Sequence, residues 1–325
     1  MMKEPLRLYL DQNFAANLSD SYHATGRLSE QQKAFRRLHD TITGLVDDEK
    51  LMVPISLAHC WETHKRTHPD SKQRLQETFL SLSRGRGLGH FTHEEALNLF
   101  KRLEREPELD LWQLSGMVGI EQMKLGKKNP KDFEQLFALR AAGWFSSPEE
   151  EFRQFFHAVE QEAAEVKSIA EQYATYTNQQ IQQQPTPLKQ IYTNLLSLSL
   201  DNAINTVEVT PQREALLQEH YPWLFNREKR KEREELLATM PSHYCFFRLE
   251  YGKRDKRAKF VQNDFFDCIA YASAIPYTDI VAGEKNFISL AQEAKLDQRY
   301  GTELFKGTGP NTLRQLEQQL QTRLG

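Results

Sequence analysis

The segment from Asn263 to Phe287, NDFFDCIAYASAIPYTDIVAGEKNF, constrains the fold more than any other part of the sequence. Its middle is apolar and rich in small residues, which predicts a tightly packed helix followed by the short strand DIVAG. Carboxylates nevertheless stand at both ends: Asp264 and Asp267 at the start of the helix, and Glu284 just after the strand. Because burying an unpaired carboxylate costs free energy, these side chains must lie at an exposed rim or beside a positive charge.

Short apolar runs near both ends of the chain predict a small, mostly parallel β-sheet. The runs at 6–10, 51–55 and 279–283 each stand next to segments whose apolar residues have helical spacing, and 302–307 is a weaker fourth run. Strands that alternate with helices in this way are typical of an α/β fold whose sheet is covered on both faces. The middle of the chain instead shows helical periodicity throughout.

The chain of 325 residues is therefore expected to have a core interrupted by a large all-helical insertion. In order along the sequence, we expect the N-terminal half of the core at 1–70, the helical insertion at 71–250 and the C-terminal half of the core at 251–325. Within the insertion, apolar and aromatic residues step by three or four from Phe152 to Tyr176, which predicts a long helix over about 147–183. We interpret this stripe as core packing, with a partner-binding face as the alternative.

Composition excludes several classes of protein. A formal net charge of −3 excludes a chain that is basic overall, although a local basic patch remains compatible with it. The three cysteines lie far apart with no CxxC pair, which favours buried thiols and a reduced, cytoplasmic setting. We see no signal peptide, and no run of 18 apolar residues predicts a membrane span. P-loop, Rossmann, GxSxG and HExxH motifs are absent as well.

Two more carboxylates stand at similar places in the first part of the chain. Asp11 follows the first apolar run, and Glu62 lies in the helix after the second run. Because the carboxyl ends of parallel strands meet at one edge of a sheet, we expect Asp11, Glu62, Asp264, Asp267 and Glu284 to converge there. Converging carboxylates raise one another's pKa values unless a cation neutralises them, and oxygen-only ligands suit Mg²⁺ or Mn²⁺. For Asp11 and Asp264 taken singly, the alternative is capping of a helix.

In this order, the segments resemble a PIN-like nuclease domain. The strand that ends in Asp11, Gln12 and Asn13, the helix that bears Glu62, and the acidic helix and strand that end in Glu284 carry the resemblance. It covers about the first 70 and the last 70 residues, with Glu where the last acid is usually Asp. The resemblance implies a three-layer α/β/α fold and metal-dependent cleavage of RNA, less often DNA. The five carboxylates would be the catalytic residues and would hold one or two Mg²⁺ or Mn²⁺ ions, and a toxin or antiviral defence role is implied.

A basic stretch, YGKRDKRAKF at 251–260, stands immediately before the acidic helix. We expect its cations to hold a phosphate backbone beside the metal site: Lys253, Arg254, Lys256, Arg257 and Lys259. The alternative is a solvated loop next to a core strand in YCFFRLEY. RNA is thus the expected partner, and the helical insertion is a surface for a homodimer or a regulatory partner. A different class of function is a catalytically silent PIN-like scaffold that acts through such partners, with the carboxylates as caps and surface charges.

Overall fold

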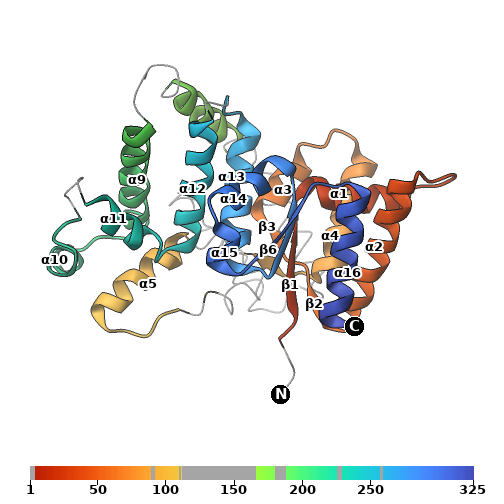
Figure 1. Cartoon of the computed structure of the whole chain (residues 1–325), viewed down its shortest axis with the longest axis horizontal. Coiled ribbons are helices and arrows are strands. Elements are labelled where there is room, and N and C mark those ends of the chain that lie inside the picture. Colours follow the sequence, from red (N-terminus) through yellow and green to blue (C-terminus); the bar gives the residue numbers. More distant parts are fainter. Residues whose placement is uncertain are drawn as a thin grey trace, which may run out of the picture.

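The computed structural model describes residues 4–88, 92–109, 111, 166–179, 188–224, 229–256 and 259–325. The chain there is mostly helical with a small parallel sheet, which confirms the expected α/β class (Figure 1). Of the long helix expected over 147–183, residues 166–179 are described and are helical. Residues 147–165 and 180–183 of the expected helix, and Arg257, lie outside the described residues.

Four parallel strands form the main sheet, in the order β2-β1-β5-β6. The strands are β1 (Leu6–Leu10), β2 (Leu51–Met52), β5 (Ile280–Gly283) and β6 (Glu303–Lys306). β1 pairs with β2 through Leu6 opposite Leu51, and with β5 through Leu10 opposite Ala282. The first and last parts of the sequence therefore share one sheet, and the carboxyl ends of β1 and β5 are adjacent.

The second apolar run is divided between two sheets. Its first two residues form β2, whereas β3 (Ile55–Ser56) pairs in parallel with β4 (Gly87–Leu88) in a separate two-stranded sheet. β3 leads directly into α3 (Leu57–His64), so the chain turns at Ser56 from the strand into the helix that bears Glu62.

Helices cover both faces of the main sheet, because successive side chains of a strand point in opposite directions. Leu6, Leu8 and Leu10 pack in one cluster with side chains of α1 (Gln12–His23), α2 (Glu30–Asp47) and α16 (Pro310–Leu324). Tyr9 faces the other cluster, which includes side chains of α13 (Gln262–Tyr277) and α14 (Lys285–Glu293). Figure 1 shows these two sets of helices on opposite sides of the strands. The remaining helices near the sheet are α4 (Pro69–Ser83) and α15 (Leu296–Tyr300).

The middle of the chain adds a group of helices beside α13 (Figure 1). They are α5 (Thr92–Glu104), α9 (Leu188–Ile204), α10 (Pro211–His220), α11 (Arg230–Leu237) and α12 (Pro241–Asp255). One hydrophobic cluster runs from Leu195 and Phe247 in these helices to Tyr9 and Val281 in the sheet. This cluster shows that the helical part and the sheet share a core. The boundaries that we expected after residues 70 and 250 fall inside α4 and α12.

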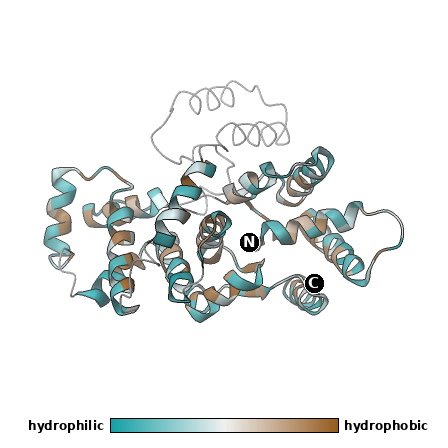
Figure 2. Ribbon diagram, turned by 90° about the horizontal axis from the view of Figure 1, so that it is seen from above, coloured by the Kyte–Doolittle hydropathy of each residue, from teal (hydrophilic) through white to brown (hydrophobic). Residues whose placement is uncertain are grey.

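Helix α12 also contains YCFFRLEY, the segment considered above as a core strand. Pro241 stands at the first turn of this helix, where its missing N–H costs nothing. The stripe of the expected long helix is partly buried: Val166 and Ala170 pack in the core, whereas Ile169 and Tyr176 are about half exposed. Within the described part of the chain, none of the helices is long and apolar enough to cross a membrane. Figure 2 shows hydrophobic and hydrophilic residues mixed along most helices.

Candidate functional site

Asp11 directly follows β1 and begins α1. The backbone amide of Phe14 donates a hydrogen bond to its Oδ1 (2.7 Å), and the hydroxyl of Tyr271 donates to its Oδ2 (2.9 Å). The side chain is buried, and burial raises the pKa of Asp11 to about 6, against these hydrogen bonds, which lower it. Asp11 is therefore both the N-cap of α1 and one of the predicted site residues.

Three more carboxylates lie around Asp11, each half-buried. Glu284 follows β5, and its Oε1 accepts a hydrogen bond of 2.9 Å from the Asn13 amide. Burial, together with the charges of Asp11 and Glu284, raises the pKa of Glu62 to about 7, against the charge of Lys65, which lowers it. The pKa of Asp267 is raised well above its ordinary value by burial, and then by the charges of Glu62, Glu284 and Asp11. The structure thus brings together four of the five predicted carboxylates, which repel one another.

Lys65 faces this group of carboxylates from the end of α3. Its Nζ donates to Oδ1 of Asn263 (3.0 Å) and lies 4.0 Å from the centre of the Phe266 ring. Burial lowers the pKa of Lys65, while the charges of Glu62 and Asp267 raise it. Lys65 was not among the residues predicted from the sequence, although its spacing of one helical turn after Glu62 was a usable signal.

Asp264 has a different environment from the other four carboxylates. Its Oδ1 lies 2.7 Å from Nζ of Lys253, and its Oδ2 accepts a hydrogen bond of 2.7 Å from the backbone amide of Val261. Both partners of the ion pair are buried. Asp264 therefore bonds back to the N-cap residue, Val261, from the third position of α13, and its ion pair joins this helix to α12. The helix begins at Gln262, so Asp264 is not itself the N-cap that the sequence alternative expected.

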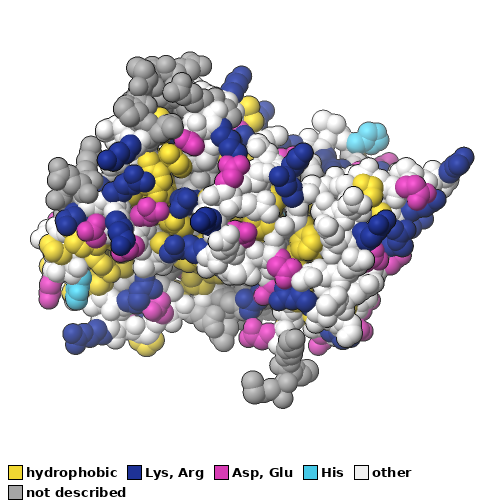
Figure 3. All heavy atoms as spheres, viewed as in Figure 1, with side chains coloured by type: hydrophobic (Ala, Val, Ile, Leu, Met, Phe, Trp, Pro, Cys, Tyr) yellow, Lys and Arg dark blue, Asp and Glu magenta, His cyan; other side chains and the backbone are white. Residues whose placement is uncertain are grey.

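The basic stretch is not the exposed surface that we expected. Lys253 and Arg254 are buried in α12, where Arg254 forms an ion pair with Glu250 one turn earlier. Lys256 lies in a surface ion pair at the end of the helix, and Lys259 is exposed. Helical geometry turns two of the expected phosphate-binding cations inward, where they neutralise buried acids. On the face shown in Figure 3, Lys and Arg side chains are interspersed with Asp and Glu.

A buried histidine, His59, forms hydrogen bonds to the two segments that carry Asp11 and Glu62. The Ser56 amide donates to Nδ1 of His59 (3.0 Å), so Nε2 carries the proton and donates to the carbonyl oxygen of Leu10 (2.7 Å). Burial lowers the pKa of His59 to about 4, which keeps the ring neutral near pH 7. These bonds join the start of α3 to the residue before Asp11 and thereby fix the spacing between Asp11 and Glu62. Sequence reasoning gave His59 no such role.

Whether a cation fits among Asp11, Glu62, Asp267 and Glu284 depends on how close their side chains lie and on their chemistry. Within the described ranges, no three His, Cys, Asp or Glu side chains are gathered in a way that could hold a metal ion. The donor chemistry, with carboxylate oxygens from four segments, is the one that Mg²⁺ and Mn²⁺ prefer. The residue types therefore match the ligand chemistry of such an ion.

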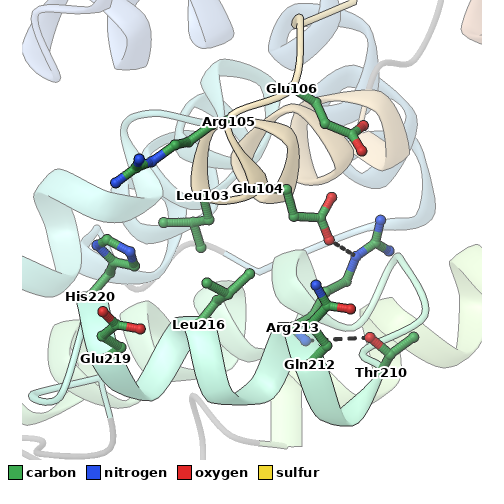
Figure 4. Close-up of a pocket in the computed structure, with 10 residues that line it drawn as sticks. All are labelled: Leu103, Glu104, Arg105, Glu106, Thr210, Gln212, Arg213, Leu216, Glu219 and His220. Carbon is green, nitrogen blue, oxygen red and sulfur yellow. Dashed lines mark hydrogen bonds and ion pairs between the residues drawn. The ribbon is translucent and has the colours of Figure 1, made fainter.

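A separate cavity of about 770 Å³ lies between α5 and α10 (Figure 4). Leu103 and Leu216 face it from the two helices, and an ion pair of 2.9 Å between Glu104 and Arg213 lies at one end. None of the five predicted carboxylates is part of its lining. Its lining carries charges of both signs, so it does not indicate one class of ligand.

Comparison with family models, with curated proteins and with solved structures gives no match to this chain.

Proposed function

We propose that this protein is a metal-dependent endonuclease with a PIN-like core, acting on RNA in preference to DNA. One observation carries the proposal: Asp11, Glu62, Asp267 and Glu284 come from the two ends of the chain to the adjacent carboxyl ends of β1 and β5. There, burial and mutual repulsion raise pKa values. A divalent cation between such carboxylates would neutralise their charges and would be bound by their oxygens. Helices on both faces of the parallel sheet support the three-layer α/β/α arrangement that the resemblance implies.

A bound Mg²⁺ or Mn²⁺ ion supplies charge neutralisation and activation of water for phosphodiester hydrolysis. Asp11 would be the fixed ligand, because each of its oxygens accepts one hydrogen bond and keeps a lone pair. Glu62 and Glu284 would close on the ion from α3 and from the end of β5. Asp264, whose oxygens are already engaged, supports α13 and does not bind the ion.

Lys65 would contact the substrate phosphate. When a cation neutralises Glu62 and Asp267, their attraction for the Lys65 ammonium weakens, and it becomes free to bind another anion. Lys167 lies close enough for its charge to lower the pKa of Lys65, and Lys285 is exposed next to Glu284. We propose that these lysines, rather than the 253–259 stretch, contact the RNA backbone first. A toxin or antiviral defence role is proposed from the resemblance alone.

The alternative proposal is a catalytically silent PIN-like scaffold that acts through a homodimer or a regulatory partner of the helical part. One observation favours it: in the described part of the chain, no three acidic or other ligating side chains are gathered to hold an ion. In a scaffold, Asp11 would serve only as a helix cap, and the raised pKa values would have no use in catalysis.

Cleavage of labelled total RNA and single-stranded DNA with Mg²⁺ or Mn²⁺ separates the two proposals. We expect the wild type to cut RNA, and Asp11→Asn and Asp267→Asn to be folded and inactive. Asp40→Asn, on the exposed side of α2, is the matched control and should cut as the wild type does. Inactivity of the wild type would support the scaffold instead, and equal cleavage by all variants would mean that these carboxylates are not the active site.

A further inference from the structure

Tyr271 lies one helical turn after Asp267 on α13, and its side chain is fully buried. Its hydroxyl lies between the ends of β1 and β5, 2.9 Å from Oδ2 of Asp11 and 2.6 Å from the backbone nitrogen of Glu284. The backbone N–H of Glu284 can only donate, so the hydroxyl accepts from it. The proton of the hydroxyl is thereby directed to Asp11.

The space for this hydroxyl exists because residue 283 is glycine. A Cβ atom at Gly283 would lie 2.0 Å from the hydroxyl oxygen of Tyr271 and 2.8 Å from its Cζ. The ring cannot move aside easily, since it stacks on Phe287 with 5.5 Å between ring centres and 4° between the planes. Gly283 is thus required for close approach of the tyrosine to the strand.

The result is a carboxylate held from two sides. Phe14 of α1 donates to one oxygen of Asp11, and Tyr271 of α13 donates to the other. With a donor on each oxygen, the carboxylate cannot rotate without losing a hydrogen bond, and a buried loss of this kind is costly.

We propose that Tyr271 is a positioning residue that orients Asp11 for the divalent cation, an inference that rests on the proposed function. Groups that hydrogen-bond a metal ligand fix its direction, and their loss typically lowers metal affinity about 10- to 100-fold. Gly283 takes part by leaving room for the hydroxyl. Neither residue touches the substrate in this scheme.

The test is the affinity of the full chain for Mn²⁺, measured by titration calorimetry at fixed pH without nucleic acid. Tyr271→Phe removes the hydroxyl and keeps the ring, and we expect its affinity to fall about 10- to 100-fold. The matched control is Tyr277→Phe, which removes a tyrosine hydroxyl that donates to Glu95 at the other end of α13. Its affinity should stay within twofold of the wild type, because Glu95 is not among the proposed ligands.

Each outcome has one reading. If the wild type binds Mn²⁺ and Tyr271→Phe binds it equally well, the inference about Tyr271 is wrong and the proposed function stands. If the wild type binds no Mn²⁺, both fail. Should Tyr271→Phe not fold, Gly283→Ala, which displaces the hydroxyl by contact, must show the same loss of affinity. If neither variant folds, Tyr271 is needed for the fold itself, and the positioning role is overturned.

Discussion

Replacing Asp267 with asparagine should make the metal-free protein more stable at pH 8, although most substitutions destabilise. The Asp267 carboxylate is half-buried and forms no hydrogen bond or short ion pair with any described residue. Its pKa is raised by burial and by the charges of Glu62, Glu284, Asp11 and Asp264. Asparagine has the same shape without the charge, so the substitution removes the repulsion and the smaller attraction to Lys65 and keeps the packing.

The magnitude follows from the neighbouring groups. Two unit charges 4 Å apart repel by about 1 kcal/mol in water and about 4 kcal/mol at an effective dielectric constant of 20. The pKa of Glu62 is raised from 4.5 to about 7 and that of Asp11 from 3.8 to about 6. Each shift corresponds to about 3 kcal/mol, of which burial supplies the largest part. We therefore expect the asparagine variant to gain about 1–3 kcal/mol in the free energy of unfolding.

The direction of the pKa shifts sets the pH dependence. A carboxyl group whose pKa is higher in the folded than in the unfolded protein binds more protons when folded. The folded state therefore loses stability as pH rises between the two pKa values. For Asp11 and Glu62, this interval runs from about 4 to about 7. The pKa of Asp267 is raised in the same direction, so the advantage of the Asp267→Asn variant should be small at pH 4 and should grow as the pH rises toward 8.

Denaturant unfolding in EDTA at pH 4, 6 and 8 measures this difference. Asp264→Asn is the matched control: it changes the same residue type three positions earlier, but leaves Lys253 buried without its partner. Breaking a buried ion pair in this way costs about 3–5 kcal/mol, so the two variants should change stability in opposite directions. A destabilised Asp267→Asn at pH 8, or a gain that does not vary with pH, would refute the reasoning.

Three further predictions follow from the same site. Mn²⁺ at 100 times its Kd should add about 2.7 kcal/mol to the free energy of unfolding of the wild type. An equal free energy of unfolding in Mn²⁺ and in EDTA would contradict a cation site. In an NMR titration, His59 should gain its proton near pH 4; a midpoint near 6.5 would mean that its bonds to Ser56 and Leu10 do not form. Lys65→Met should raise KM for RNA with little change in kcat and reduce the slope of log affinity against log salt by about one, whereas an unchanged slope would exclude a phosphate contact.

The sheet and the acids at its edge could be predicted because the signals are local. The apolar runs that became β1 and β5 are short and bulky, and their carboxyl ends carry Asp11 and Glu284 directly. Parallel pairing then brings these two residues to one edge whatever the rest of the chain does. The position of Glu62 needed only the helix after the second run, which the structure also has.

The role of the basic stretch could not be predicted, because it depends on tertiary packing. Its density of charge suggested a solvated segment, yet Pro241–Asp255 is one helix whose inward face carries Lys253 and Arg254. Whether a lysine faces solvent or a buried acid depends on which helix packs against it. Sequence spacing in α12 and α13 does not show that Lys253 meets Asp264.

The contrast between the two aspartates of α13 argues for a site rather than for a pair of structural acids. Lys253 of α12 reaches Asp264, whereas Asp267, one turn later, faces the other carboxylates. The helical part of the chain therefore neutralises Asp264, whereas Asp267 remains beside carboxylates that repel it. A fold that needed only to bury α13 would lose nothing by an uncharged residue at position 267. Charge that is kept at a cost in stability is typical of positions that bind a ligand, and under the proposed function the ligand that would relieve the cost is a cation.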